Sequence, residues 1–332
     1  MFIKSAAFLR ISLDYPLEIN EELTEKRGLY YYLDFKRVNT DYILPNVSFD
    51  GTGIPRFNYA IVPSPNNKNG FIYSITYICW YALGCLQEYL DKGDNRGKDS
   101  FIRQADWLME HASVENGVVS WPIEFPWNVY GTWLPVPRVS SMDQGLAISV
   151  LIRAYLLTSQ DRYLKTAKQG EQFYDIPLGQ GGFNHRLKNG SVFYEMYPSN
   201  DPSLILDGHI FSMMGLYDLH SVIPDSMTKI RFDAGLEAVV SNIDYWNYRD
   251  IWSWFGRFYL SNPMYHKINA CWLRVLAGIS GDNNLAHLAD RWMRAYRNKI
   301  IGGYLKFRIP LSSRLFLLSR GLLGSDMRKA GV

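Results

Sequence analysis

Apolar residues recur at intervals of three and four in several long stretches of this chain beyond Phe71. In Val139–Thr158, and again in Leu204–Leu219 and Ile268–Ile279, this spacing is combined with few charges on any side. The spacing is that of an α-helix, and a helix that is apolar nearly all round belongs in a protein interior. The sequence therefore predicts several buried helices.

These buried helices share one continuation. A tight turn comes first, then an Asp or Ser suited to cap a helix, and then a segment with one apolar and one polar side. The anchoring positions Asp94, Asp161, Asp225 and Asp282 recur roughly every 60 residues. A helical hairpin repeated at that interval predicts a mainly α fold, an incomplete α/α toroid whose inner helices line a cavity and whose outer helices face water.

Two segments depart from the helical pattern. Residues 1–70 contain a stretch dense in Pro, Gly and Asn with turn signals such as Asp50-Gly51, so we expect a short, irregular, β-rich N-terminal segment. Gly181–Tyr197 alternates around Asn189-Gly190, which predicts an inserted β-hairpin. Because this hairpin lies between two helical repeats, it could project across the mouth of the cavity.

The toroid would then occupy residues 71–300, and residues 301–332 would form a basic C-terminal helix and tail. This last segment carries Arg308, Arg314, Arg320 and Arg328 among Leu and Phe residues. A helix packed on the outer ring explains such a pattern, and a weak contact with a membrane surface is the alternative.

Charge and composition narrow the range of partners and compartments. With 35 basic against 32 acidic residues, the chain lacks the excess of positive charge that is typical of nucleic-acid-binding proteins. An aromatic share of 15% suits either a core or stacking on sugar rings. No apolar run approaches the ~20 residues of a membrane span, and Met1–Leu13 lacks the features of a signal peptide. Three cysteines without ligand-like spacing favour a reducing compartment, so we expect a cytoplasmic protein.

The sequence offers no recognisable metal or nucleotide motif, so no cofactor is predicted. Polar residues do interrupt the predicted inner helices, and buried polar groups need partners. For the whole set, a polar cavity with aromatic walls points to a saccharide site. For any single residue, hydrogen bonding between helices is an equally good explanation. The set comprises Ser141, Gln144, Arg153, Asp207, His209, His266, Lys267 and Asn269.

Several blocks resemble one known family. Ser140–Tyr155 resembles the SAMAQGQAISVLxRAY segment of D-glucuronyl C5-epimerases, and Phe193–Ser199 resembles their W-Y-E-E-Y-P block. Ile205–Leu219 is similar to VLNGFxYSLxGLYDL, Trp252–Phe255 to W-S-L-Y, and Tyr265–Asn269 to Y-H-x-x-H. The similarity is collinear from about Asp50 to Trp292, which makes it far more specific than a lone motif.

This resemblance implies a reaction and a set of residues. A uronic acid within a polysaccharide would lose its C5 proton and regain one on the opposite face, without a metal. Tyr197 and Tyr265 would be the retained catalytic tyrosines. The family likeness also implies a homodimer. Side chains that would contact the substrate or support the tyrosines are Gln144, Arg153, Glu195, His266, Asn269 and Arg257.

Three positions depart from the family blocks: Met196 replaces a Glu, Phe255 a Tyr, and Asn269 a His. Each replacement removes a group that can move a proton. An epimerase-like enzyme is the leading interpretation. Two alternatives remain open, namely a glycan-binding relative without catalysis and a polysaccharide lyase, which shares the C5 proton abstraction.

Overall fold

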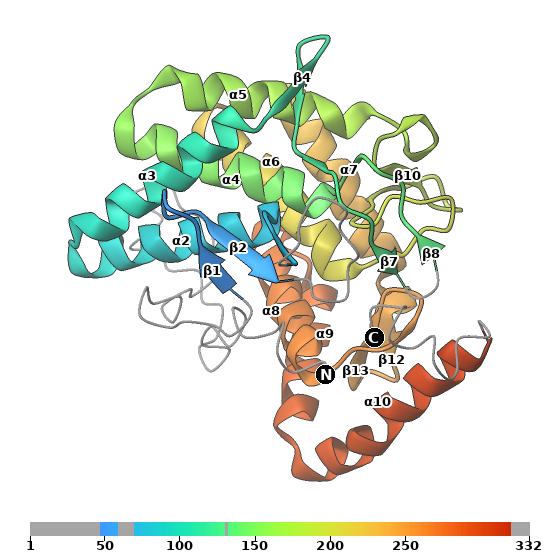
Figure 1. The fold of residues 1–332 in the computed structure, drawn as a ribbon. Helices are drawn as coiled ribbons and strands as arrows, with labels where there is room; N and C mark the ends of the chain where they lie inside the picture. The colour runs from blue at the N-terminus through green and yellow to red at the C-terminus, as the bar shows by residue number, and fades with distance from the viewer. Residues whose placement is uncertain (1–46, 59–69, 130–131, 320–332) are drawn as a thin grey trace.

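The computed structural model describes residues 47–58, 70–129 and 132–319. Within this part of the chain, helices pair as hairpins around a helical core (Figure 1). The inner members are α2 (Ile75–Lys92), α4 (Ser141–Thr158), α6 (Leu206–Val222) and α8 (Pro263–Ser280). Their outer partners are α3 (Asn95–Glu110), α5 (Asp161–Glu171), α7 (Ser226–Asn242) and α9 (Asn283–Arg297). Helix α4 packs against both α2 and α6, and α6 packs against α8, which confirms the predicted incomplete toroid.

Burial follows the predicted division between inner and outer helices. Most residues of α4 and α6, on all sides of each helix, are buried, whereas α3, α5 and α9 bury only one side. The carboxylates of Asp94, Asp225 and Asp282 accept backbone N–H bonds at the starts of α3, α7 and α9. Asp161 differs, because it is the first residue of α5 and Gln160 occupies the capping position without a side-chain bond.

Two glycines allow α4 and α6 to approach backbone to backbone. A Cβ atom on Gly145 would lie 2.5 Å from the Cα of Ser212, and one on Gly215 would overlap the carbonyl of Gly145. Since no side chain fits between them, this crossing fixes the position of α6 relative to α4. The loops that precede both helices are thereby held close together.

Short strands lie in the segments that connect the helices and in the segment that precedes α2. The antiparallel sheet β1-β2-β3 covers the described part of the predicted N-terminal segment; residues 1–46 and 59–69 lie outside the described residues. The hairpin of β10 and β11 turns at Gly190, whose φ of 86° is left-handed. Other strands lie in the loops before α4 and α8. The strands are β1 (Val47–Phe49), β2 (Pro55–Asn58), β3 (Phe71–Ile72), β4 (Ser113–Glu115), β5 (Val118–Ser120), β6 (Pro122–Ile123), β7 (Asn128–Val129), β8 (Thr132–Trp133), β9 (Arg138–Val139), β10 (Asn184–Arg186), β11 (Val192–Tyr194), β12 (Asn247–Tyr248), β13 (Trp252–Phe255) and β14 (Tyr259–Leu260).

Strand β11 packs into the core, which differs from the expectation that its hairpin could cross the cavity mouth. Phe193 and Tyr194 are both buried. The ring of Phe193 stacks on His209, and the backbone N–H of Tyr194 donates to the Nδ1 of His209. The apolar side chains on both faces of this strand are the reason, since each face finds a helix to cover it.

Helix α10 (Lys299–Ser319) follows the last hairpin and runs along the lower edge of the molecule in Figure 1. Leu305 is buried against Tyr248, Trp252 and Leu260. Residues 320–332 of the predicted C-terminal segment lie outside the described residues. In the part of the chain that the structure describes, no helix combines the length and the apolar character that crossing a membrane requires.

Candidate active site

The inner helices begin at one common end of the toroid, here called the N-terminal face. Thr76 in the first turn of α2 donates a hydrogen bond to Asp143 in the first turn of α4. The backbone N–H of Ser141 donates to the carbonyl of Glu195, 3.3 Å away. Met196 in turn packs against Gly208 in the first turn of α6. These contacts bring the starts of α2, α4 and α6 together with the segment that follows β11.

Both predicted catalytic tyrosines lie against one apolar cluster at this face. Tyr197 follows β11, and Tyr265 lies in the first turn of α8. Each is partly buried and neither is enclosed in the main core. Two of the replaced family positions, Met196 and Phe255, belong to the same cluster. This tyrosine cluster comprises Val129, Leu134, Ile205, Phe255, Phe258 and Tyr259, with Trp127, Met196, Tyr197, Tyr265 and Phe316 packed on it.

Glu195 closes the loop that carries Tyr197. One carboxylate oxygen accepts bonds from the backbone N–H and the hydroxyl of Ser203, at 3.0 and 2.7 Å, and the other accepts from the N–H of Leu204 at 2.9 Å. Burial raises the pKa of Glu195 from 4.5 to about 7, although these bonds and the charge of Arg257 act in the opposite direction. These hydrogen bonds hold the loop that follows β11, so the Glu195 side chain positions Tyr197.

Arg257 joins this loop to the turn between β13 and β14. Its guanidinium pairs with the carboxylate of Asp201, and its backbone N–H donates to the carbonyl of Ser203 at 3.2 Å. Gly256 makes the approach possible, because a Cβ there would overlap the Ser203 carbonyl and because its φ is 52°. Arg257 keeps partial exposure near the tyrosine cluster, and its pairing with Asp201 offsets much of its charge.

His266, which the family resemblance placed among the side chains that contact the substrate or support the tyrosines, is enclosed in the protein interior. The side chain is fully buried and stacks on Trp252, with ring centroids 3.6 Å apart. Its Nδ1 accepts from the N–H of Ser253 at 3.0 Å, and its Nε2 lies 3.3 Å from the carbonyl of Trp292. Burial lowers the pKa of His266 from 6.5 to about 3, so the imidazole is neutral at physiological pH.

Asn269 lies one turn further along α8 and shares the surroundings of His266. Its Nδ2 donates to the hydroxyl of Ser253 at 3.1 Å, whereas its buried Oδ1 has no partner among the described residues. Within these residues, Asn269 therefore acts as a structural contact between α8 and β13.

Gln144 and Arg153 also lie between helices, Gln144 in the first turn of α4 and Arg153 further along it. The amide of Gln144 donates to the carbonyls of Val119 and Gly170 at 2.8 and 2.9 Å. The guanidinium of Arg153 forms a buried ion pair with Asp218 on α6, with 2.5 Å between the charged atoms. These contacts correspond to the helix-to-helix alternative.

Two buried carboxyls lie at the N-terminal face: Asp143, which the sequence did not single out, and Asp207, which belongs to the predicted set of inner-helix polar residues. Asp143, bonded by Thr76, has its pKa raised by burial from 3.8 to about 6. Asp207 in the first turn of α6 has its pKa raised by burial from 3.8 to about 7, against the effect of the N–H groups of Asp207 and Gly208. The Oδ1 of Asp207 has no hydrogen-bond partner among the described residues. The available sequence signal was an acidic residue in the first turn of the two most apolar inner helices, α4 and α6.

We expect Asp207→Asn to stabilise the protein at neutral pH. The raised pKa means that the folded state binds the Asp207 proton more tightly than the unfolded state does. Stability therefore falls as pH rises from about 4 to about 7, and a shift of about 3 pKa units corresponds to roughly 4 kcal/mol at most. Thermal unfolding between pH 4 and 8 measures the gain, which should be largest at pH 8 and vanish near pH 4.

Asp244→Asn provides the matched control, because it makes the same change at an exposed carboxyl. A gain that does not change with pH, or an equal gain in both variants, would contradict the assignment of a buried, protonated Asp207.

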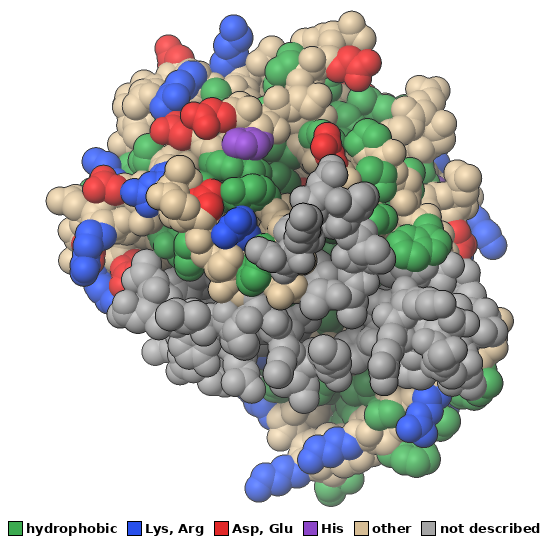
Figure 2. Space-filling model, viewed as in Figure 1, with side chains coloured by type: hydrophobic (Ala, Val, Ile, Leu, Met, Phe, Trp, Pro, Cys, Tyr) green, Lys and Arg blue, Asp and Glu red, His purple; other side chains and the backbone are tan. Residues whose placement is uncertain are grey.

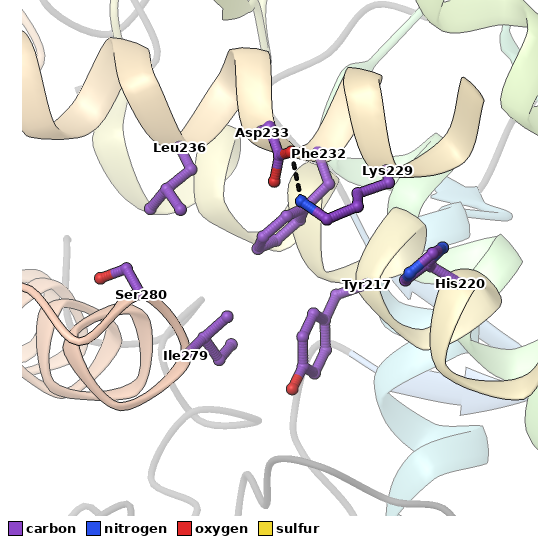
Figure 3. A pocket seen from close by; sticks show the side chains of 8 residues that line it. All are labelled: Tyr217, His220, Lys229, Phe232, Asp233, Leu236, Ile279 and Ser280. Carbon is purple, nitrogen blue, oxygen red and sulfur yellow. Dashed lines mark hydrogen bonds and ion pairs between the residues drawn. The ribbon is translucent and has the colours of Figure 1, made fainter. Parts of the chain in front are cut away.

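A hollow of about 360 Å³ lies at the opposite end of the toroid, where α6 and α8 end (Figure 3). Tyr217 and Phe232 form its aromatic side, while Lys229 and Asp233 pair with each other at 2.5 Å. It meets α8 at Ile279 and Ser280, which are roughly 20 Å along that helix from Tyr265. None of the predicted site residues lines it.

No group of three or more His, Cys, Asp or Glu residues in the described ranges is arranged to hold a metal ion. The candidate proton-active groups at the N-terminal face are the phenols of Tyr197 and Tyr265 and the carboxyls of Asp143 and Asp207.

Residues 115–294 match the family described as D-glucuronyl C5-epimerase C-terminus. A D-glucuronyl C5-epimerase of Caenorhabditis elegans is 25% identical over 335 residues, covering 83% of this chain and 52% of that protein. The chain thus spans about half the length of this relative. An uncharacterized protein of Methanocaldococcus jannaschii is 20% identical over 282 residues, covering 81% of this chain and 89% of its own.

Among solved structures, a GH76 alpha-mannanase of Bacteroides thetaiotaomicron superposes with a TM-score of 0.50 at 12% identity. The match covers 74% of this chain and 63% of that one. At this identity the likeness concerns the fold alone, a helical toroid.

Proposed function

The chain belongs to the D-glucuronyl C5-epimerase C-terminus family, and we propose that it is an epimerase-like enzyme acting at C5 of a uronic acid within a polysaccharide. The observation that carries this proposal is the placement of Tyr197 and Tyr265. The two tyrosines that match the family blocks pack on one cluster at the N-terminal face, and both keep some exposure.

In the proposed reaction, one group removes the C5 proton and the electron pair moves into the neighbouring carboxyl group to give an enediolate. A second group then returns a proton to the opposite face. A phenol with a pKa near ~10 must be shifted by about 3 units, or roughly 4 kcal/mol, to serve as a base at neutral pH. The helix N-termini at this face favour negative charge, and Tyr265 lies in the first turn of one of them.

Asp207 is our candidate for the proton-transfer role that Met196 cannot play. Met196 packs on Gly208, and Asp207 immediately precedes this glycine in the first turn of α6. A carboxyl with a pKa of about 7 can both give and take a proton at neutral pH. If this proposal is correct, the more stable Asp207→Asn variant also turns over more slowly.

Deuterium incorporation at C5 tests the function. The purified protein is incubated in heavy water with a glucuronate-containing polymer, and the product is analysed for label and configuration. Label together with the inverted configuration at C5 supports an epimerase. An unsaturated chain end, whose C5 carries no hydrogen and therefore no label, identifies a lyase. If no uronate polymer in a panel gains label yet one of them binds, the replacements Met196 and Phe255 favour the glycan-binding alternative.

The polymer partner follows from this proposal, since a uronic acid supplies the acidic C5 proton. A homodimer and a cytoplasmic location remain predictions. Size-exclusion chromatography with light scattering and localisation of the tagged full chain address them separately.

A further inference from the structure

Helix α10 exposes an apolar stripe, in which the hydroxyl of Tyr304 forms a hydrogen bond with the hydroxyl of Tyr248. Ile300, Tyr304, Phe307, Leu315 and Leu318 are all exposed, with 84% of Ile300 and 70% of Phe307 accessible to solvent. Their spacing follows the repeat of an α-helix, so they share one side. Leu305, Ile309 and Phe316 lie on the other side and pack against the body. The helix therefore has two apolar sides, and only one is covered.

The charge around this stripe has a single sign. Residues 291–319 contain seven Lys or Arg and no Asp or Glu, although the whole chain is nearly neutral at +3. Lys299, Lys306 and Arg314 are exposed, and no ion pair to another described residue involves them. In Figure 2 the lower end of the molecule, where Figure 1 draws α10, displays Lys, Arg and hydrophobic side chains.

We propose that α10 binds the surface of an anionic lipid bilayer, with its exposed apolar stripe inserted at the level of the headgroups. An exposed apolar stripe flanked by basic residues is the pattern of an interfacial helix. A second copy of the chain fits less well, because pairing two such helices would oppose many positive charges without one acidic residue to offset them. An anionic polymer would neutralise the charge but leave Phe307 and Leu315 in water.

This inference is independent of the proposed reaction, but it bears on access to the site. Phe316 of α10 packs on Phe258 in the tyrosine cluster, with ring centroids 5.2 Å apart. A bilayer bound along the outer side of α10 would therefore lie beside the element that supports Tyr197 and Tyr265. A polymer attached to a lipid would be presented close to that face.

Co-sedimentation with vesicles tests the proposal without any substrate. The full chain is mixed with phosphatidylcholine vesicles that contain or lack phosphatidylglycerol. We expect binding only with the anionic lipid, weakening as salt is added. The double variants Phe307→Ser/Leu315→Ser and Lys306→Glu/Arg314→Glu should each lower the partition coefficient by about tenfold or more. All four positions are exposed, so circular dichroism should show an unchanged fold.

Ile230→Ser and Lys188→Glu, at exposed sites on other elements, are the matched controls and should bind as the wild type does. Three results would overturn the proposal: a wild-type chain that stays in the supernatant, double variants that still sediment, or controls that lose binding equally. Conversion of a dimer to a monomer by Phe307→Ser/Leu315→Ser, with vesicle binding unchanged, would assign the stripe to a second copy instead.

Discussion

Tyr265→Phe is expected to slow formation of the C5 epimer by about 10²–10⁴-fold, the usual effect of losing a positioned proton-transfer group. Tyr197→Phe should have an effect of similar size. Both side chains keep their rings, which carry the contacts with the tyrosine cluster, so the free energy of unfolding should change by no more than about 1.5 kcal/mol. Product analysis by NMR and chemical denaturation measure the two quantities on the same samples.

Heavy-water labelling of the two variants also assigns a face to each tyrosine. If each phenol serves one face of the sugar ring, a single variant still exchanges the C5 proton of one epimer without inverting it. The two variants should then retain exchange with opposite epimers. Tyr259→Phe is the matched control, because Tyr259 packs in the same cluster but has no proposed part in proton transfer. Full epimerisation by either Tyr265→Phe or Tyr197→Phe would refute the assigned roles.

Arg153→Met is expected to destabilise the fold by about 3–5 kcal/mol, because it leaves the carboxylate of Asp218 buried without its partner. Replacing both residues, as Arg153→Met/Asp218→Leu, should recover most of the loss, since an apolar pair of similar volume suits the same interior. Chemical denaturation of the wild type, the two single variants and the double variant gives the coupling free energy of the pair.

This experiment also separates a structural role from the substrate contact that the family resemblance implied. A structural ion pair predicts that the double variant regains stability and retains its KM for the polymer. A double variant that is stable but has lost affinity for the substrate would indicate that Arg153 contacts the substrate. The surface pair of Arg274 and Asp290 is the control, because removing an exposed ion pair costs at most about 1 kcal/mol.

The amino-acid sequence determined the helices and their pairing. Periods of three and four placed the inner helices, and Asp94, Asp225 and Asp282 marked the starts of three outer ones. These signals are local, since a cap or an apolar repeat acts within one or two turns. The family blocks likewise singled out Tyr197 and Tyr265 as candidate catalytic residues, because a family motif is recognised from residues that are adjacent in the sequence.

Only the tertiary structure decided which polar side chains of the inner helices face neighbouring helices. Arg153 and His266 match family positions, yet the first pairs with Asp218 and the second is enclosed against Trp252. Asp207 was only one of several polar residues in the predicted inner helices, and it is a buried carboxyl at the N-terminal face. When a helix is apolar on every side, its sequence pattern does not indicate which side faces the cavity and which side faces a neighbouring helix. That direction is set by close contacts between distant segments, such as the crossing of α4 and α6 at Gly145.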